Sequence, residues 1–373
     1  MSGKIPSLYV HFPFCETKCH YCDFYSLGRE RTREGDDTRF EKALKSEAEL
    51  SAHRLAPELD TIFFGGGTPS MTPADSMKRA LEPLWKITRV TPETEWTMEA
   101  NPSSVTTESL REYRAFGVNR VSMGVQAMRD DLLLRLGRVH SREKAISALD
   151  SIFSVGIDNV SVDLLCGVPG QSLQDIEEAM TKLTSFPITH LSCYLLTLAP
   201  HHRMHKDLPD EDTQLSHLLF IDEFMKSCGF EHYEISNFAK PGKRARHNMN
   251  YWKGQSYLAL GPSAHGFDAG SSLRWKNVSS LHKYAEMLQQ GSSPVEWTEE
   301  LTTDQKSLER WMLALRLNDG FPREWLRSSF QRGRAEGLLQ NGLLEAHPER
   351  SENLRLTTRG FALSDQVIQS LAE

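Results

Sequence analysis

Residues 8–22 read LYVHFPFCETKCHYC and carry the strongest structural signal in the chain. The segment opens with an apolar run that is typical of a buried strand. Cys15, Cys19 and Cys22 follow it, separated by three and then two residues. Because thiols stay reduced in the cytoplasm, cysteines spaced this closely indicate metal or redox chemistry rather than disulfides. The segment therefore predicts a strand that leads into a metal-binding loop.

Three thiolates on one short loop can hold three corners of a [4Fe–4S] cluster and leave the fourth iron open to another ligand. A structural zinc ion needs four ligands, and His20 is sterically a poor fourth because it stands between two of the cysteines. A redox pair of Cys19 and Cys22 would leave Cys15 without a role. We therefore predict a [4Fe–4S] cluster on Cys15, Cys19 and Cys22.

A run of glycines follows the second apolar run, where residues 65–69 read GGGTP. Glycine lets the backbone pass close to a ligand, where any side chain would collide. A glycine run alone is more often only a turn. At a strand end that corresponds to that of the cysteine loop, it favours a small ligand beside the open iron.

Segments of helical period separate six short apolar runs, of which the first lies in residues 8–10. The others are residues 61–64, 95–98, 120–123, 160–165 and 191–195. Strands that alternate with helices predict an α/β fold with right-handed crossovers. Six strands are fewer than the eight that close a full TIM barrel. We predict a partial (β/α)6 TIM-like barrel whose ligand groups lie at the carboxyl ends of its strands.

Capping residues predict several helix starts, among them those at Thr38 and Ser141. Thr38 with Glu41 has the spacing of a capping box. Ser141 precedes an apolar stripe that ends at Gly156, as an N-cap and a C-terminal glycine should.

The pattern of the chain changes after residue 235. We predict a barrel over 1–235, a connecting region rich in Gly, Ser, Asn and Trp over 236–297, and a small C-terminal domain over 298–373. The order helix, short hairpin and last helix makes the C-terminal domain winged-helix-like.

Composition restricts the class of protein. The 373 residues are 39% hydrophobic and carry a net charge of -7, which suits a soluble globular protein and argues against a nucleic-acid partner. No apolar stretch could span a bilayer, and the first residues lack the apolar core of a signal peptide. We expect a cytoplasmic protein with no transmembrane segment. No amphipathic anchor stands out, so peripheral membrane contact would depend on the acceptor of its ligand.

The cysteine loop, with Tyr21 before its last cysteine, and the GGGTP run together resemble the radical S-adenosylmethionine superfamily. This resemblance implies that S-adenosylmethionine chelates the open iron through its methionine amino and carboxylate groups. Further stretches are similar to those of the oxygen-independent coproporphyrinogen III oxidase group, and they cover nearly the whole chain. These stretches are residues 9–15, 99–102, 122–126, Arg138 and residues 163–169.

The resemblance also implies site residues. Tyr9, Gly66 and Glu99 would contact the S-adenosylmethionine on the cluster. The positions that would surround a second S-adenosylmethionine are Gly67, Thr68, Gln126, Arg138 and Asp163. For any one of these residues, a surface or capping role is the alternative.

Two features separate the oxidases from their relatives. The oxidases carry a further cysteine two residues after the last cluster ligand, and this chain has Phe24 there. Residues 247–252 read HNMNYW and resemble the HNxxYW signature of the HemW heme chaperones, and residues 261–266, GPSAHG, also occur in that group.

A heme site needs an axial ligand, an aromatic wall and cations for the propionates. Within the signature, His247 would be the axial ligand, and Asn248, Tyr251 and Trp252 would complete the site. The cations just upstream are Lys243, Arg244 and Arg246. A solvated loop is the alternative for His247, and His265 is a second, less specific candidate.

We therefore predict a heme chaperone that binds heme and passes it to an acceptor protein, such as a respiratory enzyme. The cluster and S-adenosylmethionine would govern release of heme or formation of a homodimer, and cleavage of S-adenosylmethionine is left open. The alternative is an enzyme, an oxidase that decarboxylates coproporphyrinogen III by radical chemistry, and Phe24 argues against it. Radical methyl transfer to RNA has little support in an acidic chain.

Overall fold

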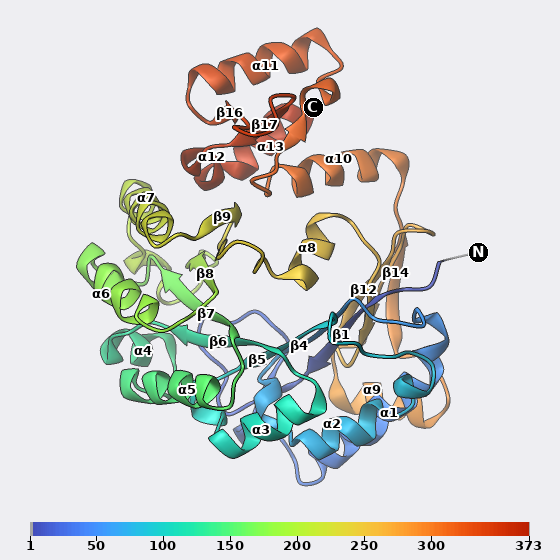
Figure 1. Ribbon diagram of the computed structural model, residues 1–373. Helices are drawn as coiled ribbons and strands as arrows, with labels where there is room; N and C mark the ends of the chain where they lie inside the picture. The colour runs from blue at the N-terminus through green and yellow to red at the C-terminus, as the bar shows by residue number, and fades with distance from the viewer. Residues whose placement is uncertain (1–2, 373) are drawn as a thin grey trace. The chain divides into compact units, whose positions relative to one another are not determined.

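The structure is a computed structural model that describes residues 3–372 (Figure 1). It divides into two compact units. Unit 1 contains the chain up to Asp163, Phe186–Ile188 and Gln255–Glu300. Unit 2 contains Leu164–Ser185, Thr189–Gly254 and the chain from Leu301 onward. The three-part division proposed from the sequence stays a prediction.

Parallel strands form the centre of unit 1. In spatial order they are β11 (Leu258–Leu260), β1 (Ser7–Phe12), β4 (Thr61–Gly66), β5 (Glu95–Ala100), β6 (Arg120–Gln126) and β7 (Asn159–Cys166). β1 pairs in parallel with both β11 and β4, and parallel pairing continues from β4 through β5 to β6. The predicted α/β class with a parallel sheet is confirmed. The sequence did not predict β11, because three residues are too few to show a period.

Helices connect these strands and pack against the sheet. They are α1 (Asp36–Ser51), α2 (Ala74–Leu81), α3 (Thr107–Phe116), α4 (Asp130–Leu136), α5 (Arg142–Ser154) and α9 (Leu281–Gln289). α1 packs beside α2 and α9, and α2 packs beside α3, so that these four helices form a continuous layer (Figure 1).

The alternation of side chains along β1 gives the strand two different faces. Leu8, Val10 and Phe12 are at most 1% exposed. The Phe12 ring centroid lies 5.7 Å from that of Phe40 on α1, in an edge-on contact. Since successive side chains of a strand point to opposite faces, Tyr9 must point away from this helix-covered core. β1 therefore contributes both to the hydrophobic core and to the opposite face, where the predicted site lies.

A second, antiparallel sheet completes unit 1. It consists of β12 (His265–Asp268), β13 (Leu273–Asn277) and β14 (Val295–Glu300), in that order.

Unit 2 begins with the end of β7. Its further strands are β8 (His190–Leu195), β10 (Asn237–Ala239) and β9 (Glu231–Glu234), and its first helices are α6 (Leu173–Thr184), α7 (Glu211–Ser227) and α8 (Arg246–Trp252). β10 pairs antiparallel with both β8 and β9.

The C-terminal part of unit 2 has the element order expected from the sequence. Its elements are α10 (Thr303–Ala314), β15 (Phe321–Pro322), α11 (Ser329–Gln340), β16 (Leu344–Ala346), β17 (Asn353–Leu356), α12 (Thr358–Ala362) and α13 (Ser364–Ala372). Trp311, Phe321 and Leu354 belong to one buried apolar cluster among these elements. The winged-helix-like assignment itself stays a prediction.

The capping predictions for Thr38 and Ser141 had different outcomes. Ser141 caps α5, accepting a hydrogen bond from the Lys144 amide at 3.3 Å, as predicted. The prediction for Thr38 was wrong, because α1 begins at Asp36 after Gly35, which adopts φ +84°. Glu41, the other half of the expected capping box, instead binds Arg79 on α2.

No helix within residues 3–372 is both long enough and apolar enough to cross a membrane.

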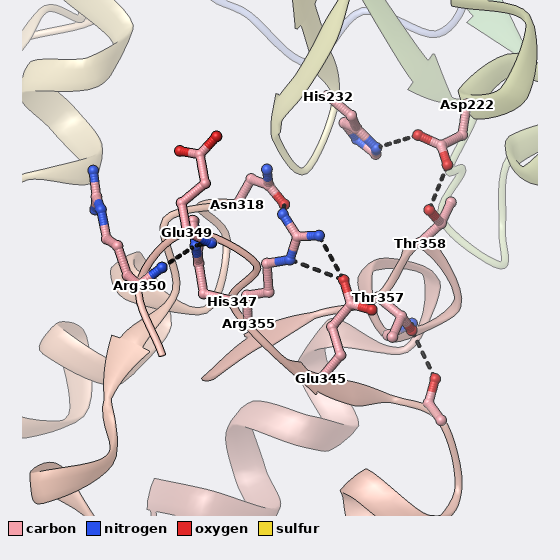
Figure 2. A network of polar contacts seen from close by, with 12 residues as sticks. Asp222, His232, Asn318, Glu345, His347, Glu349, Arg350, Arg355, Thr357 and Thr358 are labelled. Atoms are coloured by element: carbon pink, nitrogen blue, oxygen red, sulfur yellow. Dashed lines mark hydrogen bonds and ion pairs between the residues drawn. The ribbon is translucent and has the colours of Figure 1, made fainter. Parts of the chain in front are cut away.

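A polar network anchors the C-terminal elements to the rest of unit 2 (Figure 2). Asp222 of α7 accepts a hydrogen bond from Thr358 Oγ1 at the start of α12, over 2.6 Å. The same carboxylate lies 3.1 Å from Nδ1 of His232 on β9 and 2.7 Å from Nζ of Lys226. Burial alone would raise the pKa of Asp222, but the hydrogen bonds from His232, Lys226 and Thr358 outweigh it and lower the pKa to about 2. Three elements thus meet on one ionised, buried carboxylate.

Replacement Asp222→Asn should lower the free energy of unfolding of the full chain by about 2 kcal/mol at pH 7, because charge-assisted hydrogen bonds are lost. A depressed carboxyl pKa stabilises the folded state above the unfolded value of about 4, and this contribution disappears as the pH falls toward 2. The deficit should therefore be equal at pH 7 and pH 5 and shrink below pH 4. Urea unfolding followed by circular dichroism measures it. Asp365→Asn is the control, since Asp365 is 87% exposed in its ion pair with Arg316.

Candidate functional site

The cysteine loop is closed at its base by a short parallel ladder. Strand β2 (Phe14–Cys15) pairs with β3 (Leu27–Gly28), with Cys15 opposite Gly28. Inside the loop, the Cys22 amide donates to the Cys19 carbonyl at 3.3 Å. All three cysteines are partly buried. The chain therefore turns back tightly and brings the three thiols into one region.

Two polar side chains reach these thiols, one from just after β4 and one from the segment after α4. The Thr68 hydroxyl lies 3.5 Å from Cys15 Sγ, and Arg138 Nη1 lies 3.4 Å from Cys19 Sγ. Burial raises the pKa of Cys22, and its neighbours Cys19 and Cys15 raise it further. A hydroxyl and a guanidinium beside sulfur are suited to stabilise thiolates that carry a positively charged cluster.

The arrangement differs from that of a single-ion site. Within residues 3–372 no three His, Cys, Asp or Glu side chains converge as the ligands of one metal ion do. A cubane cluster does not require such convergence, because each thiolate binds its own iron. His20, the residue weighed as a fourth zinc ligand, places Nδ1 3.3 Å from the Arg135 carbonyl at the end of α4. The imidazole thus attaches the loop to α4.

The glycine run packs directly against the backbone of the cysteine loop. The Gly67 amide donates to the Phe12 carbonyl and the Thr68 amide to the Phe14 carbonyl, both at 2.7 Å. A Cβ atom at Gly67 would lie 2.6 Å from the Phe14 carbonyl oxygen. Gly66 adopts φ +104°, and a Cβ there would lie 2.6 Å from the ring of His11. Only glycine fits these positions, because the backbone of the cysteine loop and the His11 ring occupy the space that a Cβ atom would need.

One acid, Glu99, lies next to this glycine run, and a second, Asp163, is close enough to Glu99 to affect its pKa. Glu99, on β5, accepts a hydrogen bond from the Gly66 amide at 3.1 Å. Ser122 on β6 donates to Asp163 on β7, at 3.0 and 3.2 Å. Burial raises the pKa of Glu99 to about 8, and the nearby charge of Asp163 adds to the shift. A cationic group placed between these carboxyls would relieve their repulsion, which makes the site complementary to a ligand with an ammonium group.

Arg138 and Gln126 lie on the other side of Gly124. Arg138 Nη2 donates to the Gly124 carbonyl at 2.7 Å and also to Asn101 Oδ1. Arg138 Nε is buried without a hydrogen-bond partner among the described residues. Gln126 adopts φ +70°, a left-handed conformation that is uncommon outside glycine and is often found at functional sites. This guanidinium nitrogen could therefore donate a hydrogen bond to an anionic group of a ligand, such as a carboxylate.

Tyr9 and His11 extend the polar face of β1. The Tyr9 hydroxyl lies 3.1 Å from His11 Nδ1, and His11 Nε2 lies 2.8 Å from the Tyr25 carbonyl. Burial lowers the pKa of His11 to about 4, so its imidazole is neutral at physiological pH. His11 links Tyr9 to the segment after the cysteines.

The unit 1 residues predicted from the sequence come from several elements. Gly66, Glu99 and Gln126 lie at or near the ends of β4, β5 and β6, and Gly67 and Thr68 follow β4. Tyr9 and Asp163 lie within β1 and β7, and Arg138 follows α4. Sequence reasoning did not single out Asn101, Ser122 and His11, although each stands in a stretch that carried the family resemblance. The family resemblance thus contained these three residues, but their contacts are made with neighbouring segments and could not be predicted from it.

The second predicted constellation belongs to unit 2, on α8. His247 is fully buried, and its Nε2 lies 2.8 Å from the Tyr251 hydroxyl one turn later, with the two rings edge to face. Asn248, Tyr251 and Trp252 are partly buried. The surface loop considered for His247 is not what the structure shows.

The start of α8 is held by a residue that sequence reasoning missed. Ala245, the residue before the helix, has no side chain that could cap it, and the Tyr233 hydroxyl accepts a hydrogen bond from its amide at 3.3 Å. His190 Nε2 in turn lies 2.8 Å from the same hydroxyl. Of the three expected cations, Arg244 is already paired with Glu231 and Asp319, whereas Lys243 and Arg246 are exposed.

Comparisons with known proteins agree with this geometry. Residues 9–183 match the Radical SAM superfamily, the class of protein that the fold and the cysteine site define. The chain is 35% identical to "Heme chaperone HemW" of Mycobacterium tuberculosis, with 100% of this chain and 96% of that one covered. It is 32% identical to the Bacillus subtilis protein of the same name, with 97% of each covered. The chain belongs to the HemW family of radical SAM proteins.

A solved structure with a similar fold is coproporphyrinogen III oxidase (HemN) from Escherichia coli. The two chains superpose with a TM-score of 0.84 at 20% identity, and 99% of this chain and 90% of the oxidase are covered. At this identity the likeness shows the fold alone.

The acid pair makes a prediction about ligand binding. With a pKa near 8, Glu99 is protonated at neutral pH, and a bound cationic group, such as the sulfonium of S-adenosylmethionine, would favour its ionised form. Affinity for S-adenosylmethionine should therefore rise by up to ~10-fold per pH unit from pH 6 and level off near pH 8. Anaerobic equilibrium dialysis of cluster-loaded protein measures this slope. Glu99→Gln should bind weakly with a flat profile, and the control Glu41→Gln should keep the wild-type profile. A flat wild-type profile would contradict the role of Glu99.

Proposed function

We propose that this protein is a heme chaperone: it binds heme and transfers it to an acceptor protein, and it carries a [4Fe–4S] cluster with exchangeable S-adenosylmethionine. Membership of the HemW family over the whole chain is the observation that carries this proposal. The buried His247 on α8, within the HNxxYW signature, gives the proposal a specific iron ligand. A respiratory enzyme as acceptor, a homodimer and a cytoplasmic location belong to the same proposal.

Cys15, Cys19 and Cys22 would hold the cluster. When bound, the cluster would supply an open iron for chelation and a route for one-electron reduction. Gly66 and Glu99 would position S-adenosylmethionine through the backbone cradle and the acid pair, and Tyr9 would line the same face. Gly67, Thr68, Gln126, Arg138 and Asp163 would bind a second S-adenosylmethionine.

Heme binding at His247 requires a local change. Nε2 of His247, the nitrogen nearest the Tyr251 hydroxyl, cannot hold that hydrogen bond and bind iron at the same time. Tyr251 must therefore swing away before iron binds through this nitrogen. The Tyr251 hydroxyl would act as a latch that keeps the site closed in the absence of heme.

The oxidase alternative has less support. Phe24, at the position of the oxidase-specific cysteine, is 69% exposed and offers no thiol. This chain and the oxidase share a backbone fold. A shared fold does not imply a shared function, because function depends on the side chains at the site.

Titration of full-length, anaerobically purified protein with hemin tests the chaperone proposal. Wild type should give a shifted Soret band, and His247→Ala should lose its slow, tight component, with affinity reduced at least ~10-fold, because iron–imidazole ligation is removed. Tyr251→Phe should bind hemin faster, because the latch is gone. Absence of hemin binding by wild type, or conversion of coproporphyrinogen III to protoporphyrinogen IX by the same preparation, would overturn the proposal.

Reconstitution with iron and sulfide tests the cluster. Wild type should hold about four irons and four sulfides per chain. Cys15→Ala, Cys19→Ala and Cys22→Ala should each retain less than half of that content, whereas the control Cys228→Ala should retain all of it. Stoichiometric zinc in place of iron would contradict the assignment.

A further inference from the structure

The antiparallel sheet of unit 1 presents an unusual set of side chains on one face. Cross-strand partners share a face, so the register of the strands identifies the residues on this face. His265 lies opposite Lys276, which lies opposite Trp297. In the next row, Phe267 lies opposite Arg274, which lies opposite Glu299.

This face is the accessible one. His265 is exposed, and Trp297 is 45% exposed, an unusual position for so large an apolar side chain. The opposite face is buried, since Gly266, Trp275 and Asn277 lie inside unit 1. The two rows therefore form an open surface with an imidazole, two aromatic rings, two cations and the carboxylate of Glu299.

We infer that this face is a docking surface for heme, with His265 as the iron ligand; the inference rests on the proposed heme function and adds a second site to it. Phe267 and Trp297 supply apolar contacts for the macrocycle, and Arg274 and Lys276 pair with its two propionates. A row across three strands spans about 10 Å, comparable to the width of a porphyrin ring.

The state of the imidazole favours this ligand. The His265 side chain is exposed on the sheet, whereas Nε2 of the buried His247 lies against the Tyr251 hydroxyl. Burial, with a further contribution from Lys276, lowers the pKa of His265, which keeps the ring neutral and able to donate an electron pair to iron.

The cations are close enough to respond to a ligand. Lys276 Nζ pairs with Glu296 at 3.1 Å, and each side chain is about one third exposed. Such surface ion pairs contribute little to stability, so a propionate can replace the glutamate at small cost. Arg274 lies over the Phe267 ring, 5.6 Å from its centroid, so its guanidinium is already placed beside the aromatic contact.

The surface borders the face of the barrel that carries Tyr9 and His11. His265 lies close enough to His11 that a protonated His265 would lower the pKa of His11, and Tyr257 contributes to the raised pKa of Tyr9. Tyr257 exchanges two backbone hydrogen bonds with Phe267, at 2.9 and 3.2 Å. Heme on this sheet would therefore lie next to the predicted S-adenosylmethionine site. The exposed site at His265 would exchange heme quickly. The site at His247, which Tyr251 keeps closed, would bind heme slowly.

Stopped-flow mixing of hemin with the full-length protein distinguishes binding at His265 from binding at His247. Wild type should show a fast and a slow Soret phase. His265→Ala should lose the fast phase, with its amplitude reduced at least ~10-fold, and His247→Ala should lose only the slow phase. His201→Ala, which removes another exposed histidine, should behave as wild type.

Hemin dimethyl ester, in which both propionates are blocked, tests the cations. Wild type should give the fast phase at least ~10-fold more weakly with the ester than with hemin, and the Arg274→Ala, Lys276→Ala double variant should bind both equally weakly. A fast phase unchanged in His265→Ala, with the slow phase still dependent on His247, would overturn this inference and leave the proposed function intact. Absence of both phases in wild type would overturn the proposed function itself.

Discussion

The parallel pairing of β1 with β4 is the constraint on which the rest of the site depends. Its register sets Phe12 opposite Gly66, so the cysteine loop and the glycine run leave the sheet at the same edge and at the same level. Two amide-to-carbonyl hydrogen bonds, from Gly67 and Thr68, then continue the pairing beyond the strands. A slip of one residue would turn Tyr9 into the helix-covered core and bring Phe12 to the site.

The same register explains the electrostatics of the site. Parallel strands end at one edge, so Glu99 of β5 and Asp163 of β7 feel each other's charge, although they are 64 residues apart in the printed numbering. Arg138 comes from the segment after α4 and reaches a cysteine thiol from there. Acidic and basic side chains thus occupy different parts of the same polar site. The acids could bind a cationic group of a zwitterionic ligand, and Arg138 could bind its anionic group.

His247 and His265, the two proposed iron ligands, differ in how accessible they are to heme. An iron ligand must be neutral and reachable. His247 is buried on α8 and held by an intrahelical contact, and it becomes reachable only when Tyr251 moves. His265 stands exposed on a sheet whose register supplies its neighbours. A carrier must both retain heme and release it, and a closed site together with an open one meets both needs.

Local patterns in the sequence determined much of this protein. The spacing of Cys15, Cys19 and Cys22, the GGGTP run and the six apolar runs identified the α/β class and the strand ends, because each signal lies within a few adjacent residues. Ser141 was correctly predicted as a cap for the same reason. Thr38 was not, because the φ of Gly35 and the pairing of Glu41 with Arg79 depend on residues outside the expected box. Only the tertiary structure decided the hydrogen bond from the Ala245 amide to the Tyr233 hydroxyl, the addition of β11 to the sheet and the row that joins His265 to Trp297. These features arise from strand register and packing between distant segments, which no local period encodes.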